Sequence, residues 1–100
     1  AKDCAIIIPA YNAAATIVET LNSIQHLPSG MERIHSVIVA DDCSTDSTSR
    51  VATETWVHPV PLIVTVNTRN LGERETVNRA AATLPTSVLW FYILHADDIA

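Results

Sequence analysis

Apolar and polar positions form blocks along the chain, so that four short apolar runs are separated by more polar segments. These runs are rich in β-branched residues and comprise residues 5–8, 37–40, 62–66 and 88–94. Continuous apolar runs of this length are typical of strands that are covered on both faces. Pro9 is expected to end the first strand, because proline has no N–H group to donate to a neighbouring strand.

The segments between the apolar runs carry the signals of helices. Helices are expected over residues 13–27, after residue 46 through Ala52, and over residues 73–84. In the first and third of these segments, apolar residues recur at helical spacing. Asn12 is the expected N-cap of the first helix, and Pro28 and Gly30 are its stop signal.

The resulting order βαβαβαβ predicts a Rossmann-like α/β fold, with a mostly parallel sheet and right-handed crossovers. With 100 residues, the chain is one small domain at most. In such sheets, ligands bind beside the carboxyl ends of the strands. Polar residues follow the strands at that edge: Tyr11 and Asn12, Asp41 and Asp42, residues 67–72, and Asp97 and Asp98.

Composition narrows the classes of partner. Six Lys and Arg against eleven Asp and Glu give a net charge of −5, which argues against binding of nucleic acid. No apolar run is long enough to cross a membrane. Cys4 and Cys43 lack CxxC spacing and are expected to be a reduced, intracellular pair. The acidic balance still allows an anionic ligand that is held through a metal ion.

The residues at the strand ends offer the chemistry of a nucleotide site. Tyr11 provides a flat ring, and Asp41 and Asp42 provide acceptors for a pyrimidine N–H or for ribose hydroxyls. Asp97 and Asp98 are hard oxygen ligands suited to Mg²⁺ or Mn²⁺, and such an ion would neutralise a diphosphate. Each feature also has a purely structural interpretation. In that interpretation Tyr11 packs against its neighbours, and Asp41 and Asp42 form a turn and cap a helix. Asp97 and Asp98 would then belong to a solvated tail.

Four motifs follow one another in a fixed order: I-I-I-P-A-Y-N at 6–12, V-I-V-A-D-D-C-S-T-D at 37–46, N-L-G to N-R-A at 70–80, and L-H-A-D-D at 94–98. This series covers essentially the whole chain and resembles the nucleotide-binding half of the inverting family 2 glycosyltransferases, which have the GT-A fold. The resemblance implies a nucleotide-diphosphate sugar as donor, with a UDP-sugar expected first. It also implies a divalent metal, Mn²⁺ or Mg²⁺.

The resemblance assigns roles to individual residues. By position, Asp42 is the aspartate expected on the base, and the region around Tyr11, with Pro9 and Asn12, is expected beside the base. Asp41 stays a candidate nucleotide ligand on its own chemistry. The metal-binding D-x-D of the family falls on residues 95–97. Asp97 is therefore the expected metal ligand, and Asp98 is expected to support it and to contribute to the nucleotide site.

The chain departs from the family pattern at three places. His95 stands where many members carry the first aspartate of D-x-D, and Cys43 replaces the more usual glycine after the acidic pair. Residues 76–78 lack the arginine of the family's A-R-N element. Either Arg74 or Arg79 is expected to serve the diphosphate instead.

The expected domain is the nucleotide-sugar-binding portion of a GT-A domain over residues 1–100, without the acceptor half. The general base of the inverting transfer is expected beyond residue 100, so the chain alone is expected to bind a nucleoside diphosphate without transferring sugar. The acceptor would be a glycan or a lipid-linked sugar, as in polysaccharide biosynthesis. The donor implies a cytoplasmic location, at the inner face of the membrane in the full-length protein.

Two other functions remain open. One is a non-catalytic nucleotide-binding or assembly domain on the same fold. The other is a phospho-acceptor receiver domain built around Asp41 and Asp42, which the presence of a single lysine, Lys2, makes the weaker alternative. An exposed sheet edge after the fourth strand also leads us to expect self-association.

Overall fold

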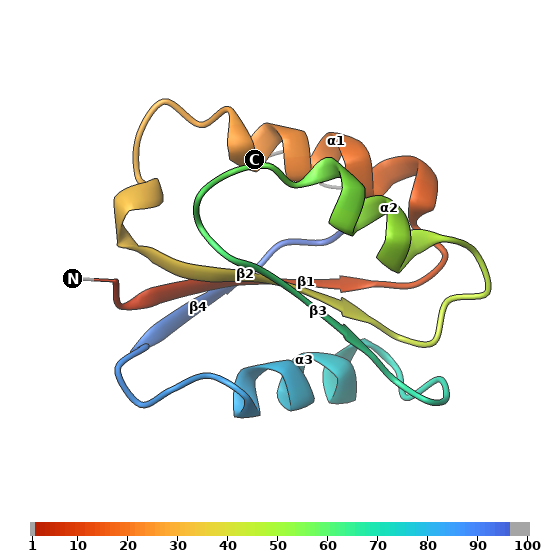
Figure 1. Ribbon diagram of the computed structural model, residues 1–100. Helices are drawn as coiled ribbons and strands as arrows, with labels where there is room; N and C mark the ends of the chain where they lie inside the picture. The colour runs from red at the N-terminus through yellow and green to blue at the C-terminus, as the bar shows by residue number, and fades with distance from the viewer. Residues whose placement is uncertain (1, 97–100) are drawn as a thin grey trace.

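The computed structural model describes residues 2–96, and these form one four-stranded sheet with helices on both faces (Figure 1). The elements in chain order are β1 (Cys4–Ala10), α1 (Ala14–Gln25), a 3-10 turn η1 (Met31–Arg33), β2 (Ile34–Asp41), α2 (Thr48–Thr55), β3 (Leu62–Val66), α3 (Glu73–Ala82) and β4 (Trp90–Ile93). The strands lie in the order β3-β2-β1-β4, and each neighbouring pair is parallel. The predicted Rossmann-like α/β fold is confirmed.

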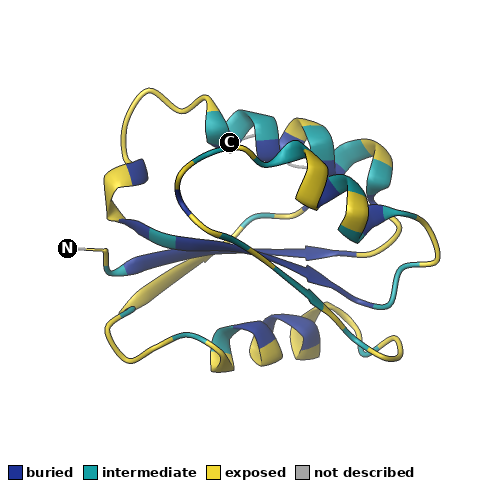
Figure 2. Cartoon of the chain, in the orientation of Figure 1, coloured by how far each residue is buried: buried dark blue, intermediate teal, exposed yellow. Residues whose placement is uncertain are grey.

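The alternation of side chains along β1 divides the core between the two faces of the sheet. Ile8 packs with Ile17 of α1 in one apolar cluster, on the face that α1 and α2 cover (Figure 1). Ile7 packs with Val77 of α3 on the opposite face. Ile7 and Ile8 are fully buried, and each such side chain stabilises the fold by about 1.5–3 kcal/mol. The central strands are therefore covered on both sides, as Figure 2 shows.

The expected end of β1 at Pro9 is wrong, because the strand continues to Ala10. Asp42 donates its N–H to Ala10 O at 2.8 Å, toward β2, and Leu94 donates to Ile7 O at 3.0 Å, on the side of β4. Successive residues of a strand direct their backbone polar groups to opposite neighbours. Pro9 therefore faces the β4 side, where β4 has already ended, and its missing N–H interrupts no ladder.

The expected N-cap role of Asn12 is also wrong. The N-cap position of α1 is Ala13, and the N–H groups of Ala13 and Ala14 bond to one side chain at the start of α2 and one just before it. Ala13 N donates to Thr48 Oγ1 at 2.9 Å, and Ala14 N donates to Asp46 Oδ2 at 3.2 Å. Because these acceptors lie more than thirty positions away along the chain, they join the start of α1 to the start of α2 and to the loop before it.

The fourth strand, β4, contrasts with the buried centre of the sheet. All four of its residues are exposed, and Trp90 and Tyr92 expose more than half of their surface (Figure 2). β4 pairs with β1 and forms one edge of the sheet that residues 2–96 build. No helix within this described part of the chain is long and apolar enough to cross a membrane.

Candidate functional site

The carboxyl ends of β1 and β2 meet the start of α3 around a small pocket of about 90 Å³. Its lining residues are Pro9, Ala10, Tyr11, Asp42, Glu73 and Thr76. Three of the predicted binding residues, Pro9, Tyr11 and Asp42, therefore come together at one rim of the sheet. The rule that ligands bind beside the carboxyl ends of parallel strands leads to the same place.

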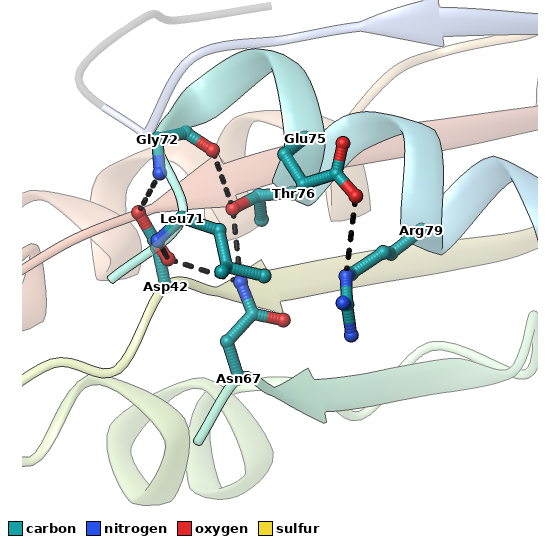
Figure 3. A network of polar contacts seen from close by, with 7 residues as sticks. All are labelled: Asp42, Asn67, Leu71, Gly72, Glu75, Thr76 and Arg79. Atoms are coloured by element: carbon teal, nitrogen blue, oxygen red, sulfur yellow. Dashed lines mark hydrogen bonds and ion pairs between the residues drawn. The ribbon is translucent and has the colours of Figure 1, made fainter. Parts of the chain in front are cut away.

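Asp42 is nearly buried and holds the loop that joins β3 to α3 (Figure 3). Its Oδ1 accepts hydrogen bonds from Asn67 Nδ2 at 3.0 Å and from the backbone N–H of Leu71 at 2.7 Å. Its Oδ2 accepts one from the N–H of Gly72 at 2.9 Å. Thr76 adds to this network, because its hydroxyl accepts from Asn67 Nδ2 at 2.9 Å and donates to Gly72 O at 2.7 Å.

These contacts decide the charge of Asp42. Burial alone raises the pKa of this carboxyl, but the hydrogen bonds from Asn67, Leu71 and Gly72 together outweigh burial and bring the pKa below its ordinary value. Asp42 is thus ionised at neutral pH and acts only as a hydrogen-bond acceptor.

Asp41 lies beside Asp42 in the sequence, but its hydrogen bonds stabilise a different segment, the turn between β2 and α2. Its Oδ1 accepts a hydrogen bond from Ser44 N at 2.9 Å, and its Oδ2 accepts one from the hydroxyl of Ser49 in α2. The side chain is buried, and both oxygens hold the turn between β2 and α2. Cys43, in that turn, has a φ of 60°, the left-handed region that a glycine adopts without strain. The contribution of Asp41 to nucleotide binding stays a prediction.

Asn12 joins the loop after β1 to the loop after β2. Its Oδ1 accepts hydrogen bonds from Thr45 N at 2.8 Å and from Thr45 Oγ1 at 3.2 Å, and its own N–H donates to Ser44 Oγ at 2.8 Å. The backbone of Asn12 has a φ of 49°, which asparagine tolerates better than most residues. Tyr11 precedes this fixed residue and leaves half of its side chain exposed, at 50%.

A second, larger pocket of about 270 Å³ adjoins the first, since three residues line both. Its lining comprises Pro9, Tyr11, Asn12, Ala13, Thr16, Glu73, His95 and Ala96. Across it, His95 Nε2 lies 3.1 Å from each carboxylate oxygen of Glu73. The N-terminal turn of α3 and the segment after β4 therefore meet at this pocket.

Glu73 and Thr76 line the site but were not among the residues that the sequence predicted. Glu73 opens α3 directly after Gly72, in a run of charged residues that is typical of a solvated helix face. The position of Glu73 in the sequence could have predicted its place in the site. α3 follows the carboxyl end of β3, and the first turn of a helix placed there faces the ligand edge of the sheet.

The family described as glycosyl transferase family 2 matches residues 5–100. The chain belongs to this family. No curated protein matches the chain by sequence.

Solved structures of S. aureus TarS resemble this family 2 chain. The structure of TarS 1-349 shares 28% sequence identity with this chain, and the two superpose with a TM-score of 0.82. The match covers 96% of this chain and 28% of TarS 1-349. The structure of TarS 1-349 in complex with UDP-GlcNAc shares 27% sequence identity with this chain, with a TM-score of 0.79. That match covers 96% of this chain and 27% of the other. The chain thus spans less than a third of the length of these structures, and its all-parallel sheet is that of the GT-A fold.

Two further predicted residues of this family 2 chain, Arg74 and Arg79, are not among the residues that line the two pockets. Arg74 is exposed in the first turn of α3, and Arg79 lies 3.5 Å from Glu75 on the same helix. Asp97 and Asp98 lie outside the described residues. Within residues 2–96, no three His, Cys, Asp or Glu side chains are grouped closely enough to hold a metal ion. The roles of Arg74, Asp97 and Asp98 stay predictions.

Proposed function

We propose that this chain forms the donor-nucleotide part of an inverting glycosyltransferase, which transfers a sugar from a nucleoside diphosphate sugar to an acceptor hydroxyl. The observation that carries the proposal is the pocket where Tyr11 and Asp42 meet at the carboxyl ends of β1 and β2. Family membership supports the same reaction class, and it weakens the receiver-domain alternative.

The donor base is a uracil. Asp42 is ionised at neutral pH and can only accept hydrogen bonds, so it favours a base that presents an N–H group to it. Uracil presents N3–H at the centre of its pairing edge, whereas cytosine presents an acceptor nitrogen at that position and donates only through its exocyclic amine. Tyr11 lines the same pocket and offers an aromatic face on which a base can stack. The solved structure of TarS 1-349 in complex with UDP-GlcNAc supports a uridine donor.

Asp97, supported by Asp98, holds Mn²⁺ or Mg²⁺ in this proposal. Carboxylate oxygens are the ligands that these ions prefer, and the two aspartates follow directly on Ala96 in the wall of the larger pocket. When bound, the ion would neutralise the diphosphate and stabilise it as a leaving group.

The acceptor site and the general base lie beyond residue 100, so this chain alone binds the donor without transferring sugar. The acceptor is a glycan or a lipid-linked sugar, in polysaccharide or glycoconjugate biosynthesis. The reaction takes place in the cytoplasm, where the nucleotide-sugar donor is found, at the inner face of the membrane.

Calorimetric titration with UDP and CDP in the presence of Mn²⁺ tests the base assignment. We expect UDP to bind about tenfold more tightly than CDP, since N3–H of uracil donates a hydrogen bond to the charged carboxylate of Asp42 and N3 of cytosine cannot. Equal affinities would contradict the uracil assignment, and no binding of either nucleotide would contradict the donor site.

The metal assignment has its own test in the same titration. Asp97→Ala should abolish the Mn²⁺-dependent gain in UDP affinity. Asp3→Ala is the matched control, because it removes the same charge at the amino end of β1, where Asp3 pairs with Arg33 at 2.8 Å. Identical heats for the two variants would contradict the role of Asp97.

A further inference from the structure

The two pockets share Glu73, which lies where a ligand in one pocket continues into the other. The first pocket contains Asp42, and the second contains His95. A nucleoside diphosphate is built in the order base, ribose and diphosphate. With its base beside Asp42, its ribose would reach the boundary that Glu73 forms before the diphosphate enters the larger pocket.

The carboxylate of Glu73 is held at that boundary. His95 Nε2 lies 3.1 Å from both of its oxygens, and Glu73 stands in the first turn of α3, where the helix dipole favours a negative charge. The carboxylate keeps further acceptor positions, because each oxygen can accept two hydrogen bonds. A carboxylate with two oxygens matches the two neighbouring hydroxyl groups of a ribose, each of which donates one hydrogen bond.

We propose that Glu73 is the residue that recognises the ribose of the donor nucleotide and selects a ribonucleotide over a 2′-deoxyribonucleotide. This inference rests on the proposed donor site and adds a specificity residue to it. His95 acts as a positioning residue, since it holds the Glu73 carboxylate toward the pocket. No covalent step is involved, and the selection is a difference in binding alone.

The same helix supplies a matched control. Glu75 stands two positions later in the first turn of α3 and has a similarly exposed side chain, at 53% against 58% for Glu73. Its carboxylate is directed to Arg79 along the helix, at 3.5 Å (Figure 3). Glu75 lines neither of the two pockets described above. Glu73→Gln and Glu75→Gln therefore remove equal charges from the same helix end, and only the first changes the site.

Calorimetric titration of UDP and of 2′-deoxy-UDP into the wild-type chain and both variants tests the proposal. We expect the wild type and Glu75→Gln to bind UDP about tenfold more tightly than 2′-deoxy-UDP, as a hydrogen bond to a charged group would give. In Glu73→Gln this ratio should fall below about twofold, mainly through weaker binding of UDP. Circular dichroism and thermal unfolding verify that both variants are folded.

The outcomes separate this inference from the proposed function. If wild-type chain binds UDP and Glu73→Gln keeps the tenfold ratio, the role of Glu73 is overturned and the donor site stands. Tighter binding of both nucleotides by Glu73→Gln would show that the carboxylate repels the diphosphate, which also overturns the role. If the wild type binds no UDP, the donor site itself fails, and the ribose assignment fails with it.

Discussion

The Oδ1 atom of Asp42 accepts a hydrogen bond of 2.7 Å from the backbone N–H of Leu71, which lies 29 positions further along the chain. A carboxylate at the end of β2 thereby determines the path of the loop between β3 and α3. This loop in turn places Glu73 at the boundary between the two pockets. The shape of the candidate site thus depends on one buried charge.

Asp42→Asn is expected to destabilise the chain by about 2–3 kcal/mol. The substitution replaces one acceptor oxygen by an NH₂ group, which then faces an N–H donor of Asn67, Leu71 or Gly72. Urea denaturation followed by circular dichroism measures the free energy of unfolding. Asp3→Asn, at the opposite end of the sheet, controls for the loss of one charge. Equal losses in the two variants would contradict a special role for the Asp42 network.

Stability should fall in acid, and Asp42 should account for part of the fall. Its pKa in the folded chain is below the ordinary value of 3.8, so its contribution to stability is present above that value and is lost as the pH drops through the folded pKa. Hydrogen bonds from Thr48 to Asp46, and from Arg33 to Asp3, likewise lower the pKa values of those two carboxyls.

We therefore expect a constant free energy of unfolding between about pH 7 and pH 5, and a steady decrease below about pH 4. Asp42→Asn should make this decrease shallower without abolishing it, because Asp3 and Asp46 still titrate. Urea denaturation at several pH values gives the comparison. A decrease that is as steep in Asp42→Asn as in the wild type would show that Asp42 is not linked to acid unfolding.

Substitutions of Asn12 separate its two structural contributions, the acceptor for Thr45 and the positive φ. Asn12→Asp keeps the acceptor and should change stability little. Asn12→Gly keeps only the backbone freedom and should lower the free energy of unfolding by about 1 kcal/mol. Asn12→Ala loses both contributions and should lower it by about 2 kcal/mol. Thermal and urea unfolding measure the series. Equal stabilities for the glycine and alanine variants would mean that the backbone at position 12 carries no strain.

The exposed edge of β4 supports the expectation that copies of this chain associate. Trp90→Lys places a charge on the edge and should shift sedimentation velocity profiles at high protein concentration toward the monomer. Val57→Lys adds the same charge at an isolated position that is 84% exposed, and it should leave association unchanged. A wild-type chain that stays monomeric at every concentration would contradict the expectation.

The strands and the fold class could be predicted because each strand contains a short apolar run, which in β1 and β2 reflects burial on both faces. The β3 strand has the predicted bounds, and Asp42 lies at the predicted edge of the sheet. The partners of Asp42 could not be predicted in this way, since the N–H groups of Leu71 and Gly72 carry no side-chain signature.

Two local predictions were wrong because tertiary contacts replaced local ones. Asn12 is the expected cap by sequence position, but Thr48 at the start of α2 and Asp46 in the loop before it accept from the first N–H groups of α1. Pro9 is a strand breaker only where a neighbouring strand needs its N–H, and that depends on how far β4 extends. Both errors come from interactions between segments that are distant in the sequence.

The order β3-β2-β1-β4 has a consequence for the assembly of the site during synthesis. β1 pairs with β2, which follows it closely in the sequence. It also pairs with β4, which emerges from the ribosome only after most of the described chain. His95 and Ala96 come with that late neighbour. A nascent chain can therefore form the hydrogen bonds around Asp42 before the far wall of the larger pocket exists, and that pocket is complete only after β4 has paired with β1.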